Sequence, residues 1–208
     1  MKLVRAILLT ALTISPALSE AATIFSDNFN SYGVAYNWSG AGGWSVTDGT
    51  VDVVGPGYFD FIPGNGSYID LDGSSMNAGL LSYGLNLIGG IAYNLSFDLA
   101  GSHRGTNENV SVSFGTTNGI YNSIPSAVGF NTYILGFTPT STGIYNISFQ
   151  NSGGDNMGAL LDNVSVDSVS QPSAVPLPAA LPLMLSGLGV LGFAARRRKK
   201  NGLRISAS

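Results

Sequence analysis

The chain has 208 residues with nine Lys and Arg, twelve Asp and Glu, and no cysteine. All but one of the basic residues lie near the two ends, so residues 23–169 hold eleven acidic residues against Arg104 alone. Such a segment repels phosphate backbones and favours cations such as Ca²⁺, so no nucleic acid is expected as a partner. Solubility outside the cell accounts for the same charge equally well. Without cysteine, an exported domain depends on packing rather than on disulfides.

The N-terminus has the pattern of a secretory signal peptide. Lys2 and Arg5 precede the apolar stretch 6–14, and small residues that suit a cleavage site follow it. The apolar stretch is too short to span a bilayer stably. We therefore expect residues 1–22 to be the signal peptide, with cleavage after Ser19 or at Ala21 or Ala22.

Residues 23–169 predict one domain made of strands. The segment 91–99 alternates apolar and polar side chains, which is typical of a half-buried strand, and the segments 110–114 and 145–149 repeat this pattern. Asp48-Gly49 separates two alternating runs, which predicts a hairpin over residues 44–54. Further strands are predicted at 24–29, 58–62, 68–71, 80–85, 133–137 and 160–166.

Many short strands, frequent glycine-containing turns and no helical periodicity before the tail together predict an all-β fold. An antiparallel β-sandwich of the jelly-roll form suits this pattern best. No repeat of fixed period is visible, which disfavours a solenoid or a propeller. The length of residues 23–169 is usual for one domain and allows a substantial core.

Four short sequence segments of this domain are informative because of the order in which they occur. They read VDVVGPG at 51–57, SYIDLDG at 67–73, YNLSFDLAG at 93–101 and LDNVSV at 161–166. In this order they resemble the jelly-roll, carbohydrate-binding-like domains related to galactose-binding modules, which occur in secreted bacterial and plant cell-wall proteins. The resemblance implies a structural Ca²⁺ between a residue near the first strand and an Asp at the start of the last one. The matching positions here are Asp27 or Asn30, and Asp162.

The strand pattern gives a separate reason to single out Asp162. Leu160, Val164 and Val166 share its parity, so the alternation directs its carboxylate toward the core, where an unpaired charge is costly. Its partner is then either a cation such as Ca²⁺ or a set of backbone N–H groups and hydroxyls at the rim.

Aromatic side chains are candidate sugar contacts, because their faces combine apolar area with a polar edge. The candidates are Tyr32, Tyr36, Trp38, Trp44 and Tyr58, of which at least half are expected to belong to the core. Trp44 shares parity with Val46 and is expected to be buried. Tyr36 and Trp38 lie in a glycine-rich segment that we predict to be a loop, and they are the better candidates for exposed ligand-binding residues.

A polar loop carrying His103 and Arg104 is predicted between the strands 91–99 and 110–114. It is either a solvated loop or one that contacts a ligand. His103 is the single histidine, so any serine triad would need it, and no Gly-x-Ser-x-Gly elbow occurs.

Asp70 and Asp72 are the pair of carboxylates that most resembles a hydrolase site. On one face of a strand they would lie roughly 6.6 Å apart, a separation like that of paired glycosidase carboxylates. Two acids on one strand do not readily flank a bond from opposite sides. We therefore expect no catalytic residue and interpret Asp72-Gly73 as the turn that ends the strand.

The last quarter of the chain has three parts. A linker at 170–178 runs into the motif Val175, Pro176, Leu177, Pro178 and Ala179. Residues 179–195 carry no charge, and as a helix they span roughly 26 Å, close to the hydrocarbon thickness of a bilayer. The tail 196–208 begins with a basic anchor that the positive-inside rule places in the cytoplasm, formed by Arg196, Arg197, Arg198, Lys199 and Lys200.

A short proline motif, a marginal membrane helix and a basic cluster, in this order, resemble the PEP-CTERM sorting signal of Gram-negative bacteria in its VPLPA-type variant. The resemblance implies an exosortase-type membrane protease as partner, an inner-membrane intermediate, and delivery to the cell surface or extracellular matrix. The motif here lacks the Glu of Pro-Glu-Pro, and an extension at 201–208 follows the cations. An ordinary C-terminal membrane anchor is the alternative.

Together these features predict an exported, non-enzymatic protein with a structural or adhesive role in exopolysaccharide or biofilm. The alternative is a dedicated carbohydrate-binding module. A glycoside hydrolase is a third and less favoured hypothesis.

Overall fold

The computed structural model describes residues 21–169 and the single residue Arg196. The predicted signal peptide, linker and membrane segment, and the remainder of the basic tail, lie outside the described residues. Among the described residues, no helix has the length and apolar character needed to cross a bilayer. Residues 21–169 form twelve strands: β1 (Thr23–Asp27), β2 (Ala35–Trp38), β3 (Trp44–Thr47), β4 (Val51–Val54), β5 (Tyr68–Asp70), β6 (Leu80–Leu87), β7 (Tyr93–Ala100), β8 (Glu108–Phe114), β9 (Thr117–Ile124), β10 (Asn131–Phe137), β11 (Gly143–Asn151) and β12 (Leu160–Ser168).

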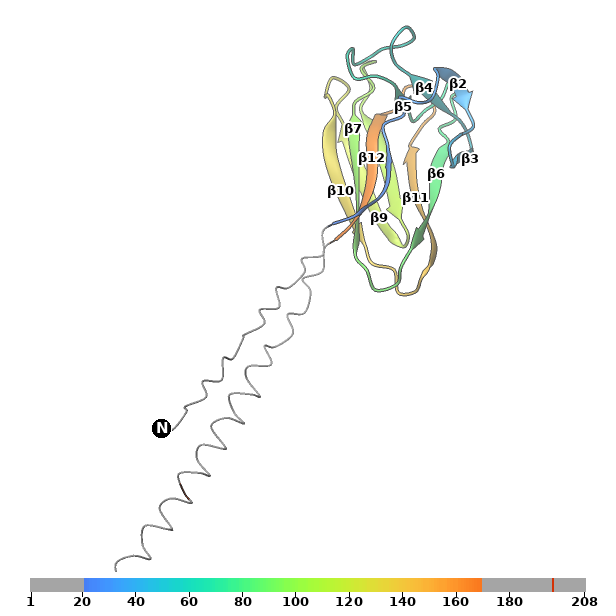
Figure 1. Ribbon diagram of the computed structural model, residues 1–208. Coiled ribbons are helices and arrows are strands. Elements are labelled where there is room, and N and C mark those ends of the chain that lie inside the picture. The colour runs from blue at the N-terminus through green and yellow to red at the C-terminus, as the bar shows by residue number, and fades with distance from the viewer. Residues whose placement is uncertain (1–20, 170–195, 197–208) are drawn as a thin grey trace, which may run out of the picture. The chain divides into compact units, whose positions relative to one another are not determined.

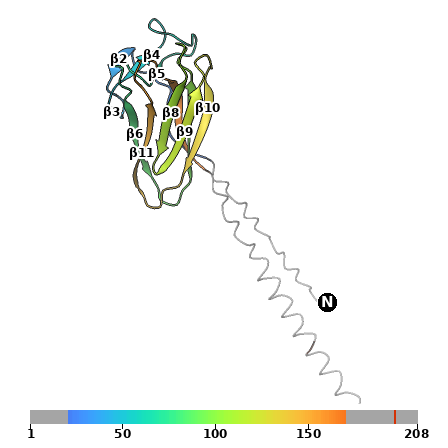
Figure 2. The same ribbon diagram turned by 180° about the vertical axis from the view of Figure 1, so that it is seen from behind.

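The strands form two antiparallel sheets that pack face to face (Figure 1, Figure 2). Sheet A has seven strands in the order β10-β7-β12-β5-β4-β2, and β1 pairs with β12 beside this path. Sheet B has five strands in the order β3-β6-β11-β8-β9. The predicted all-β fold, an antiparallel sandwich of the jelly-roll form, is confirmed.

The core lies between the two sheets and follows the period of two along each strand. In β7 the residues Tyr93, Leu95, Phe97 and Leu99 are all buried, while the residues between them face outward. Phe97 meets Phe149 of sheet B with ring centroids 5.3 Å apart. Packing of this kind supplies the cohesion that a domain without disulfides requires.

The hairpin predicted over residues 44–54 is wrong. The strands on either side of Asp48 belong to different sheets, because β3 pairs with β6 whereas β4 pairs with β2 and β5. Asp48 does adopt a positive φ of 58°, as a tight turn requires. The backbone N–H of Thr50 then donates to the carbonyl of Asn77, so this turn carries the chain from one sheet to the other.

Three other predictions about strands are also corrected. Residues 58–62 form no strand, because Pro56 and Pro63 bracket them and Phe59 turns to a φ of 46°. Residues 35–38, predicted as a loop, form β2. The strand β9 was not predicted, because Ile120 faces solvent and breaks its alternation.

Asp162 is buried as predicted, but it lies on the opposite side of sheet A from the main core. The register of β12 against β7 shifts between Asp162 and Ser165, and Asn163 has a φ of 48°, which identifies a β-bulge. Because of the bulge, Leu161 and Val164 both face the main core. The alternation that we extended from Val164 to Asp162 is interrupted, and the Asp162 carboxylate points to the outer side.

Candidate functional site

A second, small apolar cluster lies on the outer side of sheet A. It consists of the buried residues Val54, Tyr68, Ala100 and Leu160, with Phe61, Ile62 and Phe130 packed against them. The β4–β5 loop, residues 55–67, supplies Phe61 and Ile62. The backbone N–H of Ile62 donates to the Tyr68 hydroxyl at 2.9 Å, and burial raises the pKa of Tyr68 to about 12. The loop is therefore fixed against the sheet by packing and a hydrogen bond.

Four aromatic rings continue from this cluster across the loop to β2. Tyr36 and Tyr58 meet edge to face at 4.3 Å, Tyr58 and Phe59 at 4.5 Å, and Phe59 and Phe61 lie nearly parallel at 5.8 Å. Tyr36 is 50% exposed and Phe59 is 54% exposed. We call these four residues the aromatic strip. Exposed rings gathered in this way are unusual on a monomer surface and mark a binding surface.

Phe59 holds its place in the strip through an uncommon backbone conformation. Its φ of 46° lies in the left-handed region, which a bulky residue adopts at a cost of roughly 1 to 3 kcal/mol. The backbone N–H of Phe61 donates to the carbonyl of Phe59 at 3.0 Å, which closes the turn around it. The loop thus accepts strain in the conformation that exposes the Phe59 ring.

Arg104 fixes the other end of the aromatic strip. Its guanidinium carbon lies 4.7 Å from the centre of the Phe61 ring, within the range of a cation–π contact. The same guanidinium donates to Asp70 Oδ2 at 2.5 Å and to the carbonyl of Asn156 at 2.6 Å. One side chain therefore ties together the β4–β5 loop, strand β5 and the β11–β12 loop.

The partner of Arg104 is a buried carboxylate. Asp70 is 1% exposed, and its Oδ1 accepts the backbone N–H groups of Asp72 and Gly158. Burial raises the pKa of Asp70 to about 7, and the charge of Arg104 acts against this rise. Arg104 therefore compensates a charge that would otherwise be costly inside the domain.

The structure brings two of the four predicted ligand-binding residues to this surface. Tyr36 belongs to the aromatic strip, and Arg104 holds Phe61 in place. Trp38 does not take part, because its half-buried ring packs against Tyr32 at the edge of the core. His103 is exposed beside Arg104, and its backbone N–H donates to the carbonyl of Ser126.

Sequence reasoning missed Phe59 and Phe61 as members of the site, and it favoured Tyr36 and Trp38 over the candidate Tyr58. Their signal was present as three aromatic residues within four positions, bracketed by proline and glycine. We interpreted their alternation as a strand, whereas such flanking residues are typical of a loop. Trp44 is 4% exposed, so the prediction that it is buried is confirmed.

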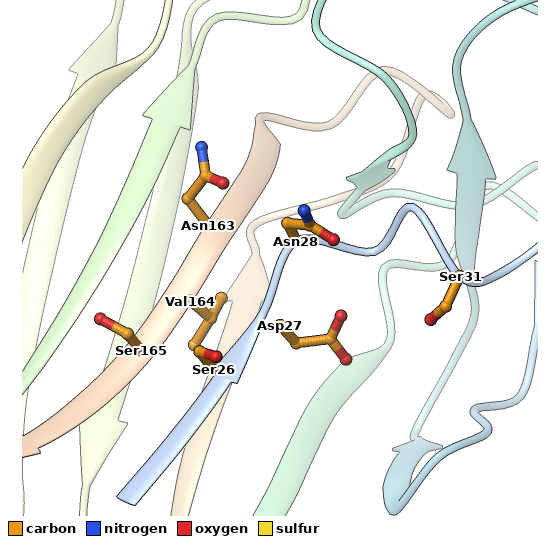
Figure 3. A pocket seen from close by; sticks show the side chains of 7 residues that line it. All are labelled: Ser26, Asp27, Asn28, Ser31, Asn163, Val164 and Ser165. Carbon is orange, nitrogen blue, oxygen red and sulfur yellow. The ribbon is translucent and has the colours of Figure 1, made fainter. Parts of the chain in front are cut away.

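A groove of about 500 Å³ lies between β1 and β12, at the end where calcium was predicted (Figure 3). Asp27 lies in this groove. Its Oδ1 accepts the backbone N–H of Phe29 at 2.8 Å, and its Oδ2 accepts Tyr32 Oη and Trp44 Nε1. The groove is lined by Ser26, Asp27, Asn28, Ser31, Asn163, Val164 and Ser165.

The other two predicted calcium ligands also accept protein hydrogen bonds. Asn30 Oδ1 accepts the backbone N–H of Ser67 at 2.7 Å. Asp162 accepts Asn65 Nδ2 at 2.5 Å and the backbone N–H of Asn163 at 2.7 Å. In residues 21–169, no three His, Asp or Glu side chains converge as metal ligands. A cation here would need amide, hydroxyl and carbonyl oxygens in addition to the carboxylates.

Asp162 nevertheless lies in an electronegative environment. Burial, together with the nearby charges of Asp98 and Asp27, raises its pKa to about 6, against hydrogen bonds from Asn163 and Asn65 that lower it. Asp98 lies directly opposite Asp162 on β7. Neighbouring carboxylates repel one another, so a cation at this end of the sandwich would be stabilising.

Asp72 is the second member of the carboxylate pair considered above. It is fully buried, its Oδ2 accepts the backbone N–H groups of Gly154 and Asp155, and its Oδ1 has no hydrogen-bond partner among the described residues. Asp70 is engaged with Arg104. Both carboxylates therefore hold loops together rather than face each other across a cleft.

Comparison with known proteins identifies the C-terminal segment. Residues 174–199 match the PEP-CTERM protein-sorting motif. This motif implies export, processing by exosortase, which is a membrane protein, and a location at the cell surface or outside the cell. The resemblance seen in the tail sequence is thereby confirmed, and it covers the motif, the apolar segment and most of the basic anchor. A comparison with curated proteins gives no match.

The domain is also similar to several solved structures. The xylan-binding domain from Paenibacillus barcinonensis is 12% identical, with 74% of this chain and 99% of that one covered and a TM-score of 0.48. A Stig cyclase from Fischerella sp. TAU is 17% identical, with 73% and 99% covered and a TM-score of 0.48. Endo-1,4-beta-D-xylanase 10B of Clostridium thermocellum is 14% identical, with a TM-score of 0.46; the match covers 74% of this chain and 30% of that protein. These values carry no information about ligand or activity.

Proposed function

We propose that this exported protein binds an uncharged glycan through the aromatic strip and acts, without catalysis, as a structural or adhesive component of an exopolysaccharide matrix. The run of Tyr36, Tyr58, Phe59 and Phe61, in which Tyr36 and Phe59 are exposed and the other two rings are half-buried, is the observation that carries the proposal. Aromatic faces supply apolar area to the C–H faces of a sugar ring at a low cost in conformational entropy.

The charge of the domain supports an uncharged ligand. Residues 23–169 hold eleven acidic residues, and the single arginine among them is engaged with Asp70. Uronate or sulfate groups would be repelled by this surface. A neutral polysaccharide chain has no such barrier and can stack along the strip.

Binding by the full-length chain to a panel of neutral and anionic polysaccharides, measured in affinity gels, tests the proposal. We expect retardation by at least one neutral polysaccharide, reduced at least about tenfold in affinity by Phe59→Ala combined with Tyr36→Ala. Ile88→Ala is the matched control, because Ile88 is 60% exposed and lies between β6 and β7, outside the aromatic strip. If Ile88→Ala weakens binding as much as the double variant, the strip is not the site.

The rival within the same class is a matrix protein with no defined glycan. Absence of binding to every polysaccharide in the panel, with the fold intact, would favour this rival. The hydrolase hypothesis finds no support in the carboxylates, because Asp70 and Asp72 are committed to loop contacts.

For the sorting step, we propose an inner-membrane intermediate in a Gram-negative cell, followed by cleavage near the motif Val175–Ala179. Mass spectrometry of the protein released at the cell surface tests this step. A product that ends upstream of residue 196 is expected, whereas a released product that ends at Ser208 would contradict cleavage. Failure of this test would leave the aromatic strip unaffected.

We further propose that Ca²⁺ binds at the end of the sandwich that holds Asp27, Asn30 and Asp162. Repulsion of the Asp162 carboxylate by Asp98 and Asp27 supports a cation at this end. Melting of the full-length chain with and without EDTA tests the proposal. We expect EDTA to lower the melting temperature of the wild type but not that of Asp162→Ala. If EDTA leaves the melting temperature of the wild type unchanged, the calcium proposal is wrong.

A further inference from the structure

We propose that the outer face of sheet B is the surface through which two copies of this chain associate. This inference goes beyond glycan binding, since it concerns the face opposite the one that bears the aromatic strip. Figure 2 looks toward this sheet, where β6, β8, β9 and β11 lie side by side.

The two sheets differ in the number of charged residues that their strands contain. The five strands of sheet B contain one charged residue, Glu108, and it is only 5% exposed. The strands of sheet A contain Asp27, Asp52, Asp70, Asp98, Asp162 and Asp167. Two copies of a strongly acidic domain repel each other unless they meet where neither carries charge. The outer face of sheet B meets this condition.

Small uncharged side chains form the middle of the face, in register across all five strands. The row runs Ser45, Ser82, Ser148, Ser113 and Asn118, as the strand pairings show. The hydroxyls of Ser45 and Ser82 lie 3.0 Å apart, and those of Ser113 and Ser148 lie 2.6 Å apart. A hydroxyl both donates and accepts, so this face is complementary to itself across a two-fold axis.

Exposed apolar area lies on both sides of this row. Ile120 on β9 is 70% exposed and Ile144 on β11 is 72% exposed. Burying two such side chains from each copy adds a hydrophobic contribution that the hydroxyl row alone would lack. Small side chains between them allow two sheets to approach to the usual spacing of about 10 Å.

The size of the face suits a reversible dimer. Four of the five strands are seven to nine residues long and β3 has four, so at a spacing of about 4.8 Å they cover roughly 600 Å² per copy. A standard interface buries about 800 Å² per partner, and weaker associations bury less. The area is therefore sufficient for association at the high local concentration of a surface matrix.

The ends of the domain leave this face free. The first strand β1 and the last strand β12 pair with each other, and both belong to sheet A. The chain therefore enters and leaves the sandwich through sheet A. A neutral polysaccharide is the other conceivable occupant, but the exposed aromatic rings that would favour it lie on loop 55–67 and β2 instead.

Cysteine cross-linking of the full-length chain in detergent tests the proposal against a clean background, because the chain has no cysteine. Ser148→Cys lies on β11, the central strand of sheet B, and Ser165→Cys on sheet A is the control. With a short bismaleimide we expect at least about tenfold more dimer from Ser148→Cys, a ratio that needs only a small difference in association free energy. Equal cross-linking by the two variants, or none by either, would overturn the proposal. Ser82→Cys repeats the test if Ser148→Cys does not fold.

A pair of charge variants gives an independent readout. Ser113→Asp with Ser148→Asp places four added charges in the dimer, and sedimentation of the full-length chain should then show only monomer. Ser96→Asp with Ser165→Asp adds the same charges to a neighbouring serine pair on sheet A and should leave the dimer intact. A dimer that survives the first pair of substitutions would contradict the proposal. Loss of polysaccharide binding by the first pair, with no dimer in the wild type, would assign the face to polysaccharide instead.

Discussion

The two outer faces of the sandwich differ in loop coverage and in the kinds of side chain that they expose. On sheet A, loop 55–67 folds over the strands, covers a second apolar cluster and exposes the aromatic strip. The buried acids Asp52, Asp70 and Asp162 also lie on this side. Sheet B presents strand side chains directly to solvent, and these are hydroxyls, amides and two isoleucines. A loop therefore covers part of the outer face of sheet A, whereas the strands of sheet B face solvent directly.

The two faces also differ in how many buried carboxylates they contain. Buried carboxylates are tolerated on the sheet A side because each is held by specific donors, such as Arg104 for Asp70 and Ser74 for Asp52. These contacts also fix the loops that carry the strip. The strands of sheet B hold one buried carboxylate, Glu108, which accepts hydrogen bonds from Thr106 and Asn151. The outer face of sheet B carries no charged residue, and substitutions on that face should have much smaller effects on folding.

The largest expected effect is that of Arg104→Ala. Removing the guanidinium leaves the Asp70 carboxylate buried without its charge partner and frees Phe61, so we expect a loss of about 3 kcal/mol in the free energy of unfolding. Urea unfolding measures this loss. Ser113→Ala on sheet B is the control and should change the free energy by less than about 0.5 kcal/mol. Similar values for the two variants would refute the contrast between the faces.

Two glycine substitutions sharpen the same contrast. A Cβ added to Gly158 would meet Asp70 Oδ1 at 2.6 Å and would collide with the backbone of Asp72, so Gly158→Ala should cost about 2 kcal/mol or more. A Cβ added to Gly84 on sheet B would meet its nearest atom, Asn146 Oδ1, at 3.3 Å. Gly84→Ala should therefore remain within about 0.5 kcal/mol of the wild type. Thermal melting of both variants distinguishes these outcomes.

Stability should fall as pH rises from about 5 to 8. The pKa of Asp70 is raised to about 7, so the folded state binds a proton that the unfolded chain has already released. The contribution is complete below the unfolded pKa near 4 and is lost as pH rises through the folded value. We expect a decrease on the order of 1 to 2 kcal/mol in urea titrations, and a flatter profile for Asp70→Asn. An unchanged slope in that variant would show that Asp70 does not titrate in this range.

Phe59→Gly should change stability little but should weaken glycan binding strongly. Phe59→Gly removes a bulky residue from a φ of 46°, so relief of backbone strain offsets the lost ring contacts, and stability should change by less than about 1 kcal/mol. Glycan binding should fall sharply because the strip loses its most exposed ring. A large decrease in melting temperature would mean that Phe59 supports the fold rather than the ligand.

Alternation predicted the fold class and most strands, because a half-buried strand in an antiparallel sheet has a clear period of two. It failed where that period is interrupted. The bulge at Asp162 reversed the expected side of the carboxylate, and Ile120 in β9 faces solvent. Pairing was less predictable than strand formation, since the turn at Asp48 is set by contacts with Asn77 that lie 29 residues away in the sequence.

The site was predicted only in part for a related reason. Tyr36 and Arg104 were selected because they lie in polar or glycine-rich segments, and the structure joins them through Tyr58, Phe59 and Phe61. That connection depends on how loop 55–67 folds back over sheet A, which no local pattern specifies. Trp38 was selected on the same grounds as Tyr36 and lies on the same strand, β2, yet its ring packs against the core. The register of β2 shifts between Ala35 and Trp38, and Asn37 has a φ of 48°, so the alternation is interrupted between the two rings.

The position of β12 has a mechanical consequence for a protein held by its C-terminus. This strand is hydrogen-bonded to β1, β5 and β7 and lies in the interior of sheet A. Force transmitted along the chain from the sorting motif therefore has to shear ladders on both sides of β12 together, rather than peel off an edge strand one bond at a time. The described domain thus ends in one of its most firmly embedded strands, an arrangement that would resist pulling in the adhesive role that we propose.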